Sequence, residues 1–377
     1  MNGYFLCGSL LFLYYAVIFL GLKLCDPNFS KLRQKKHLFI EAGLVVICVA
    51  GFHVLSERYI YYWDYGAYWY WTIGPNWLEM KFSELFKILI QSIDQQDYNI
   101  SLSLLVSIPL KFFGNSYKAF VILNTILFYI PNGIIISEAI YAAQERCGFS
   151  ENKIRDSIVP FFAIGFSGFL LPILAGYVDI ASCPFAAMAF LLILKRDENK
   201  IEWKKDLLLS CCLLGLILMR RYFAYVAVGG AAFVLPYWLT EKKLLKIRII
   251  DLFVTVLPAF VIVYFNFPEL VHRYLFNNFA VAYSAYNALT FGQKWLSLFF
   301  YFGILFCAFM FASLFVFVNW KISKLAWCFA FSFLTTGAIF FSTQDLGIHH
   351  YYIILFQACF LVYLGFAVVL EKINWGG

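Results

Sequence analysis

Long apolar runs recur along the chain and restrict its fold more than any other feature of the sequence. A helix that crosses the hydrocarbon core of a membrane needs about 20 residues, and roughly 17 to 25 are tolerated. Of the 377 residues, 63% are hydrophobic and only 14% are charged, which excludes a soluble globule. We therefore expect an all-α polytopic membrane protein. Eleven runs, several of them short or kinked, are candidate transmembrane helices: 3–22, 38–55, 117–142, 157–175, 180–194, 206–219, 222–239, 249–266, 295–318, 324–342 and 351–370.

The positions of Lys and Arg predict how these helices are oriented. Cytoplasmic loops of membrane proteins carry an excess of positive residues. This rule predicts a cytoplasmic C-terminus and an N-terminus outside, and it accounts for the net charge of +7 without nucleic-acid binding. A basic run follows 3–22 and no basic residue precedes it, so we expect a retained span rather than a signal peptide. Twenty of the 29 Lys and Arg residues lie in the predicted inner segments: 23–37, 143–156, 195–205, 240–248, 319–324 and the tail after 371.

The one long connection, 56–116, falls on the predicted outer side. The segment 99–113 within it is apolar but short and contains Pro109, and a full span here would reverse the predicted side of every later loop. We expect it to lie on, or dip into, the outer face. We expect 81–93 to form a helix in the membrane interface, although a loop that packs its apolar side downward gives the same geometry. Helical spacing places five apolar residues of 81–93 on one face: Phe82, Leu85, Phe86, Leu89 and Ile93.

The most unusual stretch is 59–71, in which nine of thirteen residues are aromatic and Asp64 carries the only charge. A carboxylate at the outer membrane boundary can act as a general base on an acceptor hydroxyl, or bind a metal. The flat faces of Trp63, Tyr65 and Trp69 can stack on a sugar. Because Trp and Tyr also concentrate at membrane interfaces, an aromatic belt with an incidental Asp is the structural alternative. We predict Asp64 as the catalytic residue and the three aromatic residues as sugar or acceptor contacts.

Arg220 and Arg221 are the only charges within 207–240. This apolar run is too long for one span, so the chain must turn near Met219–Tyr222. The rising limb is only about 20 Å long as a helix, which leaves both guanidinium groups below the outer headgroups. Ionisable residues at such depth indicate function, and phosphate is their natural ligand because Arg binds it bidentately. A pair of Arg side chains that snorkel to lipid headgroups is the alternative.

Acidic and histidine residues provide further candidates on the predicted outer side. Asp345 and His349 are four residues apart, so on a helix they would share a face and offer two metal ligands, fewer than a metal site needs. We prefer His349 or the adjacent His350 as a hydrogen-bond donor to a phosphate oxygen, and an interfacial loop with exposed His is the alternative. Asp345 is a candidate sugar or acceptor contact, as is Asp179, which stands alone at the outer turn before 180–194.

The layout of these features resembles the GT-C superfamily of integral-membrane glycosyltransferases, which includes protein O-mannosyltransferases and lipid A aminoarabinose transferases. The likeness is architectural, covers 38–240, and rests on no single diagnostic motif. Two features depart from it, because the span 3–22 is extra and the first outer loop holds one Asp where paired acidic residues are common. The matching features, in chain order, are Asp64 in WDYGAYW, the segment ending in Lys111–Gly114, the basic inner turn at Arg146, Asp179 in GYVD, and Arg220 and Arg221 at a break between helices.

The resemblance implies a glycosyltransferase that moves a hexosyl or pentosyl group from a polyprenyl-phosphate carrier to a glycan, lipid or protein acceptor of the cell envelope. It implies that Asp64 activates the acceptor hydroxyl, with inversion, and that the lipid phosphate is bound by Arg220, Arg221, His349 and His350. No cofactor is specified, and a divalent metal stays open. The resemblance also divides the chain into an extra span with its basic loop (1–37), a catalytic membrane module (38–240) and variable C-terminal helices (241–377).

Two other functional classes stay open. A membrane glycan polymerase or ligase shares outer-face Arg and His residues and is the nearer alternative. A lipid or solute transporter is more distant, because the sequence shows no repeated halves. No Gly-rich phosphate loop is visible on the cytoplasmic side, which argues against nucleotide-driven chemistry. The low Gly and high Phe, Ile and Lys usage indicates a bacterial plasma membrane.

Overall fold

The computed structural model describes residues 2–56, 64–73, 76–96, 99–149, 152–197, 200–239, 245–276, 284–315, 320–345 and 347–373. This part of the chain is helical and contains no β-strand, which confirms the predicted all-α class. The α-helices are α1 (Gly3–Cys25), α2 (Ser30–Gln34), α3 (Lys36–Ser56), α4 (Asp64–Ile73), α5 (Phe82–Gln95), α6 (Ser101–Phe113), α7 (Tyr117–Asn124), α8 (Ile130–Cys147), α9 (Lys153–Gly165), α10 (Ser167–Leu174), α11 (Cys183–Leu194), α12 (Trp203–Met219), α13 (Ala224–Leu239), α14 (Leu245–Asn266), α15 (Pro268–Leu275), α17 (Phe291–Phe315), α18 (Trp320–Phe341) and α19 (Tyr352–Ile373).

Seven helical segments among the described residues are long and apolar enough to cross a membrane. They are Gly3–Cys25, Lys36–Ser56, Tyr117–Cys147, Ile249–Asn266, Phe291–Phe315, Lys321–Phe341 and His349–Glu371. The expectation of a polytopic membrane protein is therefore supported by seven candidate spans. The other four predicted runs are helical but shorter or interrupted. The run 157–175 is divided at Phe166 between α9 and α10, and α11, α12 and α13 have 12, 17 and 16 residues.

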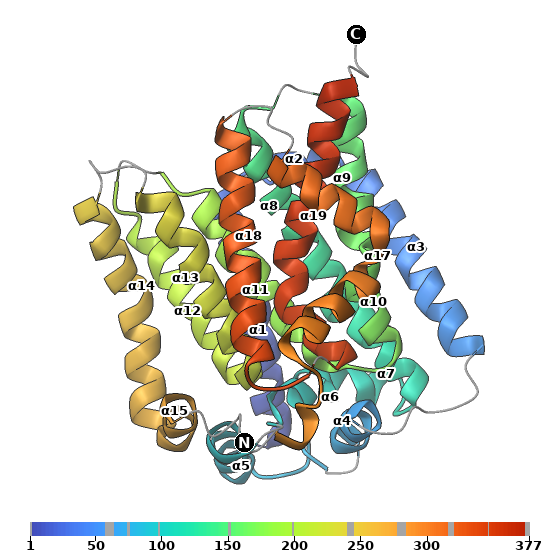
Figure 1. Cartoon of the computed structure of the whole chain (residues 1–377). Helices are drawn as coiled ribbons and strands as arrows, with labels where there is room; N and C mark the ends of the chain where they lie inside the picture. The colour runs from blue at the N-terminus through green and yellow to red at the C-terminus, as the bar shows by residue number, and fades with distance from the viewer. Residues whose placement is uncertain are drawn as a thin grey trace.

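The long helices run side by side, and α4, α5 and α15 lie across the end of the bundle where the N-terminus is found (Figure 1). The C-terminus and α2 lie at the opposite end. There, Arg146 donates hydrogen bonds to the carbonyl oxygens of Leu194 and Arg196, and Arg155 pairs with Glu371 at 2.8 Å. Three segments that the charge pattern places on one side, 143–156, 195–205 and the C-terminal tail, thus meet at one end of the molecule.

The transverse helix α5 is amphipathic, as its spacing predicts. Its apolar residues Leu85, Leu89 and Ile93 are buried, while Phe86 is exposed. The three buried residues pack in one cluster with residues of α1, α6, α14 and α15. Asp94, at the end of α5, accepts a hydrogen bond from the Leu270 backbone N–H at 3.1 Å, in the first turn of α15. Because the first N–H groups of a helix lack intrahelical partners, this carboxylate ties α15 to α5.

Helix α6 lies inside the bundle end and not on its surface. Eight of its side chains are buried, and it packs against α1, α4 and α7. The expectation is that 99–113 lies on, or dips into, the outer face, and its relation to a membrane face stays a prediction. Asn99, just before the helix, donates a hydrogen bond to the Leu218 carbonyl oxygen at 3.0 Å. This bond fixes the start of α6 beside the last turn of α12.

Candidate functional site

A polar cluster forms where α12 ends, at the end of the bundle that also holds α4, α5 and α15. Helix α12 ends at Met219, Arg220 is extended (φ −154°, ψ 120°), and the short 3-10 helix η3 (Arg221–Phe223) leads into α13. The chain therefore turns where the sequence predicts. We call the following residues the Arg220 cluster: Tyr68 of α4, Asp179 of the 3-10 helix η2 (Val178–Ser182), Arg220, Tyr222, and His349 and His350 of the 3-10 helix η6 (Ile348–Tyr351).

The cluster is centred on an ion pair between Arg220 and Asp179. Arg220 Nε lies 2.8 Å from Asp179 Oδ1, and the two side chains are 4% and 0% exposed. The same oxygen accepts hydrogen bonds from the Tyr222 hydroxyl at 2.6 Å and the Tyr68 hydroxyl at 3.4 Å. The guanidinium lies 5.4 Å from the Tyr68 ring centroid and 5.0 Å from that of Tyr222. A charge so far from water is stable only when it is paired in this way.

Asp179 keeps one oxygen for another partner. Its Oδ2 is buried and has no hydrogen-bond partner among the described residues. Most buried polar atoms in proteins are hydrogen-bonded, so an exception requires an explanation. A hydroxyl or other donor on a bound ligand would satisfy it. Asp179 therefore uses Oδ1 for its contacts within the cluster, and its Oδ2 has no hydrogen-bond partner among the described residues.

Both histidines lie against aromatic rings. Tyr177, two residues before Asp179, stacks on the His349 ring with 4.4 Å between centroids. The His350 ring lies edge-on to Tyr222 at 5.1 Å and 3.9 Å from the His349 ring. The Gly347 backbone N–H donates to His350 Nδ1 at 2.9 Å, which makes Nδ1 an acceptor. Neutral His350 therefore carries its proton on Nε2, where it is a hydrogen-bond donor.

The Arg221 backbone contacts a different element from the one that pairs with Arg220. Its carbonyl oxygen accepts a hydrogen bond from the Tyr274 hydroxyl of α15. Burial raises the pKa of the Tyr274 phenol, so this group stays a neutral donor. The two adjacent Arg residues are thus held by separate partners, Arg220 by Asp179 and the Arg221 backbone by α15.

Asp345 lies outside the cluster. Its carboxylate is 3.3 Å from Lys294 Nζ and accepts the backbone N–H groups of Ala288 at 2.9 Å and Leu289 at 3.3 Å. These bonds tie the segment after α18 to the segment before α17. Asp345 also precedes η6 and is not helical, so the helical geometry considered for Asp345 and His349 does not occur. Its observed contacts are structural.

The segment predicted to be the first outer loop is described in part. Asp64 is the first residue of α4, but the side chains of Asp64 and Tyr65 lie outside the described part, and so does the whole of Trp63. Trp69 is half-buried and meets the Tyr117 ring edge-on at 6.0 Å. Tyr68, one helical turn after Asp64, reaches Asp179 and Arg220. The sequence reasoning did not select Tyr68 or Tyr222, although each lies within four residues of a predicted site residue.

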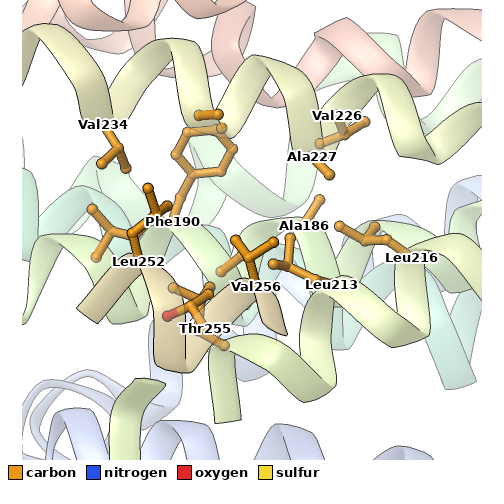
Figure 2. A pocket seen from close by; sticks show the side chains of 15 residues that line it. Ala186, Phe190, Leu213, Leu216, Val226, Ala227, Val234, Leu252, Thr255 and Val256 are labelled. Atoms are coloured by element: carbon orange, nitrogen blue, oxygen red, sulfur yellow. The ribbon is translucent and has the colours of Figure 1, made fainter. Parts of the chain in front are cut away.

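An apolar groove lies beside the cluster, between α11, α12, α13 and α14 (Figure 2). It encloses about 620 Å³ of space, part of which is open to the exterior. Thr255 is the only residue with a polar side chain among those that line it. Leu216 lines the groove and its carbonyl oxygen accepts the Arg220 backbone N–H at 3.3 Å. The groove therefore ends one helical turn from the Arg220 cluster.

Within the described residues, no group of three or more His, Cys, Asp and Glu side chains is placed to hold a metal ion. Comparison with protein-family models, with curated proteins and with solved structures finds no match.

Proposed function

We propose that this protein is a glycosyltransferase that moves a sugar from a polyprenyl-phosphate carrier to an acceptor on the extracytoplasmic face of a bacterial plasma membrane. The proposal includes eleven membrane crossings, in which the shorter helices α11, α12 and α13 and the broken α9–α10 pair cross inside the bundle. The observation that carries it is the buried Asp179–Arg220 pair, which lies at one end of the bundle beside an apolar groove. An amphiphile with an anionic head and a hydrocarbon tail is the ligand class that matches both features.

The residues divide between the two halves of the reaction. The acceptor hydroxyl oxygen attacks the anomeric carbon while the bond from that carbon to the phosphate oxygen breaks, and the hydroxyl proton passes to the Asp64 carboxylate. Arg220 and Arg221 stabilise the charge on the departing lipid phosphate, to which His350 Nε2–H is a donor. Asp179 Oδ2 accepts a hydrogen bond from the sugar or the acceptor. Aromatic faces such as Tyr177 and Trp69 suit the apolar side of a sugar ring.

The position of the cluster favours a transferase over a transporter. Transporters bind their substrates near the middle of the membrane, between repeated halves. Here the Asp179–Arg220 pair lies at the end of α12. This is the end of the bundle where the transverse helices α4, α5 and α15 are found. Chemistry at the membrane surface needs this position, because the acceptor arrives from water.

Native mass spectrometry of the detergent-purified protein with undecaprenyl phosphate tests the phosphate assignment. We expect binding by the wild type and by Asp64→Asn, and loss of binding in Arg220→Ala/Arg221→Ala. Arg33→Ala is the matched control, because Arg33 is exposed on α2 at the opposite end. Equal binding by all four proteins, or by none, refutes the assignment.

The transferase step needs a second assay. Proteoliposomes would be loaded with a panel of polyprenyl-phosphate sugars, and release of the free lipid phosphate would be followed with and without candidate acceptors. We expect release from one donor that depends on Asp64 and on the acceptor. Transport of the lipid without bond cleavage would refute a transferase and favour a flippase, and growth of a glycan chain would favour a polymerase.

A further inference from the structure

A second buried charge cluster lies close in sequence to residues that line the apolar groove away from Arg220. Arg196, two residues after α11, donates from Nη2 to Oδ1 of Asp206 on α12, and the same nitrogen lies 2.9 Å from Asp251 Oδ1 on α14. The Asp side chains are 0% exposed and that of Arg196 is 4% exposed. We call these three residues the Arg196 triad.

The triad is adjacent in sequence to the residues that line the groove. Ile193 lies three residues before Arg196, Leu209 lies three residues after Asp206, and Leu252 directly follows Asp251. Helices α11, α12 and α14 therefore each contribute an apolar wall residue, and a charged residue lies within about one turn of it on α12 and α14 and just after the end of α11. A hydrocarbon chain laid along the groove from the Arg220 end would meet desolvated charges at this point, and it could not continue without breaking the ion pairs.

We infer that the groove holds the first isoprene repeats of a polyprenyl phosphate and that the Arg196 triad limits how many repeats the protein covers. The inference rests on the proposed function, since it places the phosphate at the Arg220 cluster. An anionic head at Arg220 and an apolar tail along α12 use the cation and the groove together. The open side of the groove lets the remaining repeats pass into the bilayer.

The structure sets the number of repeats. Asp206 and Arg220 are about 21 Å apart along α12 at a rise of about 1.5 Å per residue. An isoprene repeat contains four chain bonds and covers about 5 Å when extended, for carbon–carbon bonds of about 1.5 Å. The distance therefore matches about four repeats, far fewer than an undecaprenyl chain contains.

The chain-length dependence of binding tests this length. Geranyl, farnesyl, geranylgeranyl and undecaprenyl phosphate would be titrated against the purified protein by native mass spectrometry. We expect affinity to rise up to geranylgeranyl phosphate and then to stay constant, with geranyl phosphate about tenfold weaker. Affinity that continues to rise to the undecaprenyl chain, or that does not change with length, overturns the inference.

A glycine in the wall provides a variant that fills the groove. A Cβ built on Gly230 meets no atom within 4 Å, and Gly230 lines the groove, so we expect the ring of Gly230→Phe to occupy groove space. We expect geranylgeranyl phosphate to bind this variant about tenfold more weakly, no better than geranyl phosphate. Gly51→Phe is the matched control, because Gly51 is a helical glycine of α3 that also has no atom within 4 Å of a built Cβ. Equal effects of the two variants overturn the groove assignment.

Removal of the three charged side chains tests whether the Arg196 triad limits the number of repeats. All three residues would be changed together, as Arg196→Ala/Asp206→Ala/Asp251→Ala, because loss of one member leaves a buried charge without its partner. We expect the triple variant to bind geranyl phosphate as the wild type does, while the plateau moves to longer chains. If the plateau stays at geranylgeranyl phosphate in a variant that still binds geranyl phosphate, the triad does not limit the number of repeats.

The two proposals fail in different ways. If no polyprenyl phosphate binds the wild type, the proposed function is wrong. If binding depends on Arg220 but not on chain length or Gly230, only the groove assignment is wrong. Phosphatidylglycerol serves as the competing lipid, and equal binding with the same sensitivity to Gly230→Phe would identify a general lipid groove and overturn the isoprenoid assignment.

Discussion

The Asp179–Arg220 pair predicts a specific pattern of stability in a double-mutant cycle. Both side chains are almost fully buried, and their charged atoms are 2.8 Å apart. Removal of one partner from a buried ion pair costs about 3–5 kcal/mol, because the other charge is left without compensation. We therefore expect Asp179→Asn and Arg220→Met each to be strongly destabilising. The double variant buries neither charge, so we expect it to be more stable than either single variant.

The size of the effect follows from the chain length. The entropy of unfolding is about 2.1 cal/mol/K per residue, which gives about 0.8 kcal/mol/K for this chain. A loss of about 4 kcal/mol then lowers the melting temperature by about 5 °C. We expect the stability loss of Arg220→Met to lie near the lower limit of the range of about 3–5 kcal/mol. Asp179 keeps the hydroxyl donors of Tyr222 and Tyr68 in this variant, and each is worth about 1.5–3 kcal/mol to a charged acceptor.

The assay is thermal unfolding of the detergent-solubilised protein, followed by tryptophan fluorescence. Arg33→Met is the control, because a substitution at an exposed site is expected to change stability by less than about 0.5 kcal/mol. Strictly additive losses in the double variant would show that the two side chains do not interact. The charge pair would then not be the centre of the site, and the phosphate assignment would lose its support.

The remaining predictions concern the frame around the site. Asp94→Ala removes the acceptor for the Leu270 N–H, and we expect a loss of about 0.5–2 kcal/mol with faster hydrogen exchange confined to α15. Gly176 has φ +91°, and a Cβ there would lie 2.7 Å from the Tyr117 hydroxyl oxygen, so Gly176→Ala should cost at least about 1–2 kcal/mol in thermal unfolding. Partial burial, which raises the pKa of Asp26, is outweighed by hydrogen bonds from Ser30 that lower it. This stabilisation is present above the unfolded-state pKa of about 3.9 and is lost as pH falls, whereas Asp26→Asn should show a smaller pH dependence of melting below pH 4.

The sequence indicates where the chain turns but not what meets at the turn. The apolar run on either side of Arg220 is too long for one helix, so a break near Met219 follows from length alone. The contact of Arg220 with Asp179 joins residues of η2 and the turn after α12, and the Tyr68–Asp179 bond spans 111 positions in the chain. No local pattern encodes such pairings, because they result from the packing of helices.

Helix α6 shows what the charge rule leaves undetermined. Counting Lys and Arg residues indicates that 99–113 is not a full span, but it does not say whether the helix lies on the surface or inside. The apolar pattern adds one indication: Leu102, Leu105, Val106 and Leu110 lie on one side of the helix, while Leu104 lies on the opposite side. Apolar residues on both sides favour burial of a helix, and the structure buries all five.

Helix α14 runs from the Arg196 triad to α15, which contacts the turn after α12, and it forms one wall of the groove. At one end, Asp251 is held by Arg196. At the other end, α15 continues α14 and is fixed by Asp94 and by the Tyr274 hydrogen bond to Arg221. A helix held by polar contacts at both ends cannot swing away from α12 without breaking one of them. The groove is therefore formed before any ligand arrives, and under the proposed function the polyprenyl chain enters through its open side, from the bilayer.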